Sequence, residues 1–229
     1  NTIKTYTPNT QATINNVGEI TIKINDRKRY LHPAGSYLRI VGKLRKEDGS
    51  DYANADNITL TNNAPMFLFS QIEYSLGNTP IERIHHPGES TTMFCYASKP
   101  DSYNINPGMQ ICWSKDTGMS DIVHAAAAPS TQHMFMAFTA ESLVAGQYLE
   151  PNPYYNKGYD VRKEFRMFKN GYFTFEIPLS HIFGFCEDYD KIITGIEHTL
   201  ILTRQSDNSA IVKAHAAAPG KITLSEITW

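Results

Sequence analysis

The sequence has few of the features that mark secreted or membrane proteins. Its 229 residues include only three cysteines, Cys95, Cys112 and Cys186, and no Cys-x-x-Cys pair. Three scattered cysteines cannot build a disulfide framework, so we predict free, buried thiols in a reducing compartment. No apolar run reaches the roughly 18 residues that a membrane-spanning helix needs. A signal-peptide pattern is also missing from the start of the sequence.

Neither sign of charge is in clear excess. The chain has 21 Lys and Arg residues against 23 Asp and Glu, which gives a formal net charge of −2. Such a chain lacks the overall positive field that recruits nucleic acid. Short basic runs occur at Arg27–Arg29, Lys43–Lys46 and Arg162–Arg166, and we interpret them as solvated strand ends and loops. We therefore expect no specific nucleic-acid site.

Residue sets typical of catalysis or metal binding are also missing. His85 and His86 with Glu89 are nearest to a metal cluster, but adjacent histidines on a strand point to opposite faces. Ser180 lies in no Gly-x-Ser-x-Gly elbow and is better placed to cap a helix. The acidic residues of Glu187–Asp190 lack the spacing of a calcium-binding loop. We therefore expect no enzyme activity, no catalytic residues, no cofactor and no metal site.

The chain does contain short segments in which apolar and polar residues alternate. In Val17–Asn25, Ile20, Ile22 and Ile24 fall on one side, and the residues next to them are polar. This period of two is typical of a strand with one buried face. Similar segments lie at Ser36–Arg45, Ile58–Leu60, Met66–Leu76, Thr79–Ile84, Gly171–Ile177, Ile196–Arg204, Ala210–Ala214 and Ile222–Trp229. We therefore predict an all-β, antiparallel sandwich, formed as one domain over residues 1–229.

The inward positions of these strands define a predicted core. It consists of Ile20, Ile22, Ile24, Leu38, Ile40, Leu68, Ile72, Phe173, Phe175, Leu200 and Leu202. In the last strand, the apolar positions switch from Ile222 and Leu224 to Ile227 and Trp229, which predicts a bulge. We expect this switch to present Trp229 to the opposite face, as an anchor that a neighbouring domain covers. The alternative is that Trp229 folds back into its own sandwich.

Helices and one long insertion separate the strands. We expect a short helix at Glu89–Lys99 and another capped by Ser180. The stretch from Pro100 to Asp160 is dense in Pro, Gly, Asn, Ser and Asp. A connection this long is usually functional or has structure of its own. We therefore predict a loop-rich insertion with a short strand at His133–Phe138.

Three segments carry a resemblance to a known family. They are Ser36–Ile40, Leu68–Gly77 (LFSQIEYSLG) and Phe175–Tyr189 (FEIPLSHIFGFCEDY). In this order they resemble major capsid proteins of double jelly-roll DNA viruses, most closely the Polinton/Maverick and adintovirus group. The resemblance implies an eight-stranded jelly roll with short helices. This chain is long enough for one roll only, so we expect either the first half of a longer protein or a stand-alone derivative. The end at Trp229, directly after a strand-like run, favours the first half.

The same resemblance implies a function and partners. It implies a structural capsid subunit that assembles without catalysis into a protein shell, with copies of itself or a second jelly roll in a trimeric capsomer. Other capsid proteins would be further partners, and the location would be the virion, assembled inside the host cell. Tyr154, Tyr155 and Trp229 are the candidate interface residues. A second class stays open, namely a lectin-like binding module with its ligand site in the insertion, at Tyr154–Asn156 and Tyr159–Asp160.

Overall fold

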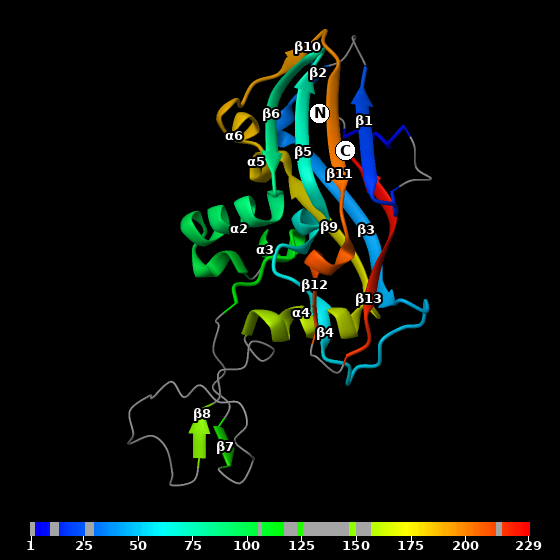
Figure 1. Cartoon of the computed structure of the whole chain (residues 1–229). Helices are drawn as coiled ribbons and strands as arrows, with labels where there is room; N and C mark the ends of the chain where they lie inside the picture. Colours follow the sequence, from blue (N-terminus) through cyan, green and yellow to red (C-terminus); the bar gives the residue numbers. More distant parts are fainter. Residues whose placement is uncertain are drawn as a thin grey trace.

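Two antiparallel β-sheets lie face to face and form the body of the molecule (Figure 1). In this computed structural model the described residues are 3–9, 14–25, 30–104, 107–116, 123–125, 147–149, 157–213 and 217–229. The first sheet has the order β1 (Gly18–Ile24), β11 (His198–Arg204), β5 (Phe69–Leu76) and β6 (Thr79–His85). The second has the order β13 (Gly220–Thr228), β3 (Tyr37–Lys46) and β9 (Tyr172–Pro178).

The N-terminal segment extends the second sheet beside β13. The backbone N–H of Tyr6 donates to the carbonyl of Trp229 at 2.8 Å, and the N–H of Trp229 donates to the carbonyl of Tyr6 at 2.9 Å. If this segment is counted as the first strand, β13 is the eighth, and these two pair with each other. The strands between them pair as β1 with β11, β3 with β9, and β5 with β6. This nested pairing is that of a jelly roll, so the predicted all-β jelly-roll sandwich is confirmed.

The strand count differs from the eight that were expected. The two main sheets contain seven assigned strands, and the described residues also form short two-stranded ladders. These ladders pair β2 (Tyr30–Leu31) with β10 (Ile193–Thr194), β4 (Ile58–Leu60) with β12 (Ile211–Lys213), and β7 (Val123–Ala125) with β8 (Gln147–Leu149). The expected strand at 133–138 lies outside the described residues.

Short helices connect the strands. They are α1 (Ala64–Phe67), α2 (Pro87–Ser98), α3 (Pro107–Gln110), α4 (Lys157–Phe168), α5 (Leu179–Ile182) and α6 (Gly184–Asp188), with 3-10 turns at Pro33–Gly35, Asp101–Asn104 and Asp207–Ala210. The helix expected at 89–99 is confirmed as α2. Ser180 is not a helix cap, because α5 already begins after Pro178. In the part of the chain that the structure describes, no helix combines the length and apolar character of a membrane span.

The interior between the sheets contains every side chain predicted for it. The buried set includes Ile20, Ile22, Ile24, Leu38, Ile40, Leu68, Ile72, Phe173, Phe175, Leu200 and Leu202. Full burial of one such side chain contributes roughly 1.5–3 kcal/mol to folding. All three cysteines are buried as free thiols, as predicted. The alternation of residues therefore identified the faces of the strands correctly.

Candidate assembly surfaces

The last strand contains the bulge that its residue pattern predicts. Its pairing with β3 shifts register between Leu224 and Glu226, so Ser225 is an extra residue on β13. An extra residue reverses which side chains face inward. As a result Ile227 and Trp229 return to the same interior as Ile222, and all three are buried.

Trp229 therefore does not lie where the anchor interpretation expects it. Its side chain is 5% exposed, and its Nε1 donates to the hydroxyl of Ser36 at 3.0 Å. The indole contacts the rings of Tyr74 and His198 edge-on, at centroid distances of 6.1 Å and 6.3 Å. The bulge thus corrects the expected position of Trp229, and the structure has the alternative in which it folds back into its own sandwich.

The other candidate residues belong to the insertion. Tyr154 and Tyr155 lie outside the described residues. Tyr159 and Asp160 were the other residues proposed for a lectin-like site. Tyr159 lies on α4, and its side chain is 1% exposed. A buried ring cannot stack on a sugar, so Tyr159 is no part of a surface binding site. Burial raises the pKa of the neighbouring Asp160 carboxyl.

Helix α4 is the element that the sequence patterns missed, and it overturns one interpretation. Arg162 and Arg166 lie on its buried side and are not the solvated residues that we expected. The Arg162 guanidinium donates to the carbonyls of Leu60 at 3.0 Å and Ser114 at 2.7 Å, and to Asp116 at 2.8 Å. These bonds fix α4 to β4 and to the loop that follows α3. The signal in the sequence is the helical spacing of Tyr159, Arg162 and Arg166.

A small cavity lies beneath α4, between the helix and one end of the sandwich. Its volume is about 30 Å³ and its walls include Leu44, Trp113, Phe165 and Phe173. Thr59 Oγ1 and Arg166 Nε line the same region and have no hydrogen-bond partner. A space of this size accommodates one or two water molecules and no sugar ring. The cavity is therefore too small for the ligand class of a lectin.

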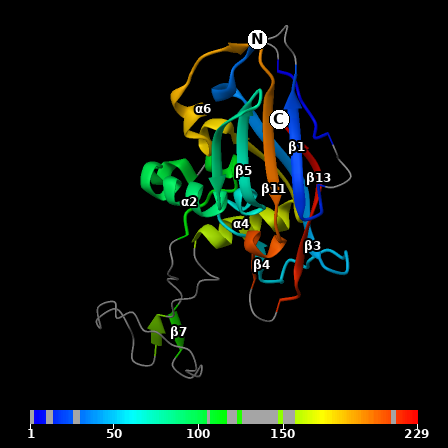
Figure 2. The same ribbon diagram turned by 45° about the horizontal axis from the view of Figure 1, so that its top comes forward.

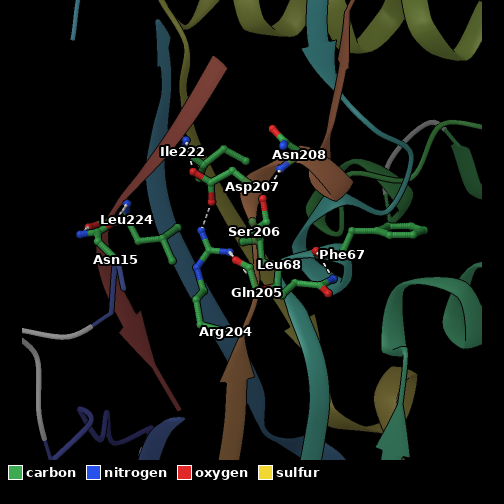
Figure 3. Close-up of polar contacts among 10 residues, drawn as sticks. All are labelled: Asn15, Phe67, Leu68, Arg204, Gln205, Ser206, Asp207, Asn208, Ile222 and Leu224. Carbon is green, nitrogen blue, oxygen red and sulfur yellow. Dashed lines mark hydrogen bonds and ion pairs between the residues drawn. The ribbon is translucent and has the colours of Figure 1, made fainter. Parts of the chain in front are cut away.

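A buried polar cluster closes the sandwich at the end of β11 (Figure 3). Arg204, which is 2% exposed, donates to the carbonyl of Leu68 at 3.0 Å and forms an ion pair with Asp207. The second oxygen of Asp207 accepts from the N–H of Ile222 at 2.8 Å. Beside it, the Asn15 amide bonds both the N–H and the carbonyl of Leu224 (Figure 3). These bonds join strands of both sheets, so the cluster has a structural role.

The pKa values of the buried histidines and cysteines lie far from neutral pH, where a general acid, a general base or a nucleophilic thiol works best. Burial lowers the pKa of His181 and of His198 to about 4, so both rings are neutral at pH 7. Burial raises the pKa of Cys95 and Cys112 to about 11 and that of Cys186 to about 12. Neutral thiols are poor nucleophiles, although Cys95 lies 3.9 Å from His181. These side chains act as packing groups.

The outer faces of the two sheets differ in charge. Along β11 the outward residues are Thr199, Ile201 and Thr203, and along β5 they are Gln71, Glu73 and Ser75. The one carboxylate among them, Glu73, is paired with Arg83 Nε at 2.6 Å. No described helix crosses the outer face of β1, β11 and β5 in either view (Figures 1 and 2).

The outer face of the second sheet is charged along its central strand. Arg39, Lys43 and Arg45 point outward on β3. Lys43 Nζ lies 2.8 Å from Asp51, and Arg39 Nε lies 3.8 Å from Glu176 on the neighbouring strand β9. Arg39 is exposed, but Lys43 is 7% exposed and its ammonium lies over the ring of Tyr172, so Lys43 is not the solvated residue that we expected.

Metal ligands do not cluster within the described ranges. No group of three or more His, Cys, Asp or Glu side chains is placed there to hold an ion. His85 ends β6, and His86 follows it in a left-handed backbone conformation. The expectation that the protein binds no metal stays a prediction.

Comparison with known proteins supplies one family match. A family model for a double jelly roll-like domain matches residues 128–229. The match fits a double jelly-roll capsid family. A search of curated proteins finds no match. The matched range contains β9 and β13 of one sheet and β11 of the other, so the double jelly-roll match includes strands from both layers.

Proposed function

We propose that this chain is a structural subunit of a viral capsid, and that it assembles into a protein shell without catalysing a reaction. The observation that carries the proposal is the nested jelly-roll strand pairing, together with the double jelly roll-like match over residues 128–229. A fold alone does not fix a function. Here the family match and the fold point in the same direction.

The interior chemistry supports a structural role. The buried ionisable side chains of the described residues join elements to one another, as Arg162 does for α4 and Arg204 for β11. The two buried histidines are neutral, and the three thiols are held protonated at pH 7. General acid–base catalysis works best with a pKa near the operating pH. These groups are therefore suited to packing.

The proposed partners are other jelly-roll domains. We propose that the chain forms one jelly-roll domain of a double jelly-roll capsomer, trimeric in its assembled state and located in the virion. The segments Leu68–Gly77 and Phe175–Tyr189, which resemble those of the Polinton/Maverick and adintovirus group, favour that class of virus. They form strand β5 with its turn, and strand β9 with helices α5 and α6.

Light scattering over a wide range of protein concentration tests this proposal. A capsid subunit is expected to form trimers or larger assemblies as the concentration rises, and electron microscopy of the same samples shows whether they are regular. The chain is measured alone and with a second jelly-roll domain supplied. A protein that stays monomeric under both conditions would contradict the proposed function.

A further inference from the structure

We infer that the cavity beneath α4 is a binding site for a small inorganic anion of about the size of chloride. Helix α4 lies across one end of the sandwich, next to β4 (Figure 1). The cavity between the helix and the sandwich has a volume of about 30 Å³. Two buried polar groups line it, the Nε of Arg166 and the hydroxyl of Thr59, and neither has a hydrogen-bond partner in the part of the chain that the structure describes.

Arg166 differs from the other charged side chains that are buried among the described residues. It is 5% exposed, and no described carboxylate forms an ion pair with it. The other buried charges all have a partner of opposite sign, and they are Lys43, Glu73, Arg162 and Arg204. A charge removed from water is normally paired, because its lost hydration is costly. Arg166 is therefore the buried cation that calls for an anion.

Neutral groups hold the Arg166 guanidinium in place. Its Nη2 donates to the carbonyls of Ala53 at 3.3 Å and Asp56 at 3.1 Å, and its Cζ lies 6.0 Å from the centre of the Tyr52 ring. The Asp56 carboxylate favours the charge from further away, but it accepts from the N–H of Ala53 at 2.9 Å and pairs with Lys46 at 3.7 Å. Burial has the larger effect and lowers the pKa of Arg166. Arginine still stays charged at neutral pH, so a positive charge lies beside the cavity.

The wall of the cavity has the chemistry of an anion site. Both of its unpartnered groups can donate a hydrogen bond, since Arg166 offers an N–H and Thr59 an O–H. The other charged residue of the wall, Arg162, is also a cation, and none of the described carboxylates lines the cavity. Most of the remaining wall is apolar and includes Leu44 and Phe173. A weakly hydrated anion tolerates such apolar contacts better than a strongly hydrated one does.

The size of the cavity limits the ligand to a single atom. A water-sized sphere needs roughly 10–15 Å³, so the cavity admits one or two of them. Chloride is only slightly larger than a water molecule and accepts hydrogen bonds from any direction. Phosphate, sulfate and organic carboxylates need more room. Met109, Val161 and Tyr172 belong to the wall and are exposed in part, so an ion can enter from solvent. A water molecule would also fit, but it would compensate no charge.

Urea unfolding of the intact chain, with chloride exchanged for gluconate, tests the site. The ionic strength stays constant, so the screening of surface charges does not change. An anion that binds only the folded state stabilises it. Above the dissociation constant, each tenfold rise in chloride concentration should raise the folding equilibrium constant about tenfold. Bromide should act in the same way as chloride. Stability that is the same in chloride and in gluconate would overturn the inference.

Three substitutions show whether the effect of chloride comes from this cavity. Thr59→Val keeps the shape of the side chain and removes one donor, so it should weaken chloride binding about tenfold or more. Arg166→Met removes the cation and should abolish the dependence on chloride. Arg39→Met is the matched control, because Arg39 is exposed, and it should leave the dependence unchanged. If Arg166→Met does not fold, Thr59→Val decides alone. A chloride dependence as strong in Thr59→Val as in the unmodified chain would contradict the proposed site.

Crystals of the protein soaked in bromide show the position of the ion directly. Bromide gives an anomalous scattering signal that water does not give. We expect an anomalous peak in the cavity, within hydrogen-bond distance of Arg166 Nε and Thr59 Oγ1. Density in the cavity without that signal would identify a water molecule, and anomalous peaks confined to the outer surface would identify non-specific binding. Either result would overturn the inference and leave the proposed capsid role untouched.

Discussion

The hydroxyl oxygen of Tyr74 lies 2.7 Å from Nδ1 of His198, deep between the two sheets. Tyr74 comes from β5 and His198 from β11, and both are buried. The ring of Trp229 packs edge-on against each of them. The pair therefore links the central strands of the first sheet to the end of the second, and its protonation state matters for stability.

Acid should destabilise the fold through its two buried histidines. Burial lowers the pKa of His198 and His181 to about 4, and in the unfolded chain a histidine has a pKa of about 6.5. As pH falls below about 6.5 the unfolded state takes up protons first, so stability is lost down to about pH 4 and then levels off. Each histidine should cost about 2 kcal/mol between pH 7 and pH 5.

Urea unfolding at several pH values measures this loss. His198→Gln removes one titrating ring, so its stability should fall less steeply between pH 7 and pH 5 than that of the unmodified chain, by roughly 1 kcal/mol per pH unit. His85→Gln is the matched control, because it replaces an exposed histidine. An equal slope for His198→Gln and the unmodified chain would show that His198 is not held neutral by burial.

Removing Arg204 should leave a partly buried carboxylate without its cation. Arg204→Met deletes the ion pair with Asp207 and the bond to the carbonyl of Leu68. Breaking one partner of a buried pair typically costs about 3–5 kcal/mol. The double variant Arg204→Met, Asp207→Asn should recover part of that loss, because the amide oxygen can still accept from the N–H of Ile222. Thermal unfolding of both variants compares them; a double variant no more stable than Arg204→Met would argue against an electrostatic cause.

Alternation in the sequence predicted the strands well and the helices less well. Strands such as β1 and β9 place apolar side chains at every second residue, and a two-layer sandwich buries that face. The segment Met66–Leu76 was predicted to be extended throughout, but its first residues belong to α1, which Pro65 helps to begin. A short apolar run has too little periodicity to separate a helical turn from a strand.

Polar side chains caused the larger errors. Helix α4 was missed because two of its buried residues are arginines, and polarity assigns such residues to water. Arg162 is buried because backbone carbonyls of two other segments accept from it. Those partners are distant in the sequence, so no local pattern reveals them. For Trp229 the sequence left two positions open, an outward anchor and burial in its own sandwich, and the extra residue after Leu224 decides for burial.

Trp229 should contribute to the stability of the isolated chain. Because its indole is buried against Tyr74 and donates to Ser36, Trp229→Ala should cost about 3–5 kcal/mol. Tyr37→Ala is the matched control, since Tyr37 lies on the exposed face of β3 and should change stability by less than about 1 kcal/mol. Urea unfolding of the isolated chain gives both values. A urea unfolding curve unchanged by Trp229→Ala would mean that the ring does not pack inside this domain.

Deletion of Ser225 tests the bulge. Ser225 is the extra residue of β13, since Leu224 lies opposite Gly42 and Glu226 lies opposite Val41. Without it the strand alternates regularly, so Ile227 and Trp229 keep their inward positions. The deletion should therefore leave the chain folded and cost no more than about 3 kcal/mol. Ser225→Ala keeps the bulge and loses only the hydroxyl bond to the carbonyl of Val41 at 3.2 Å, so it should cost less than about 1.5 kcal/mol. Circular dichroism and urea unfolding compare the two variants. If the deletion abolished folding, the inward positions of Ile227 and Trp229 would depend on more than the pairing of β13 with β3.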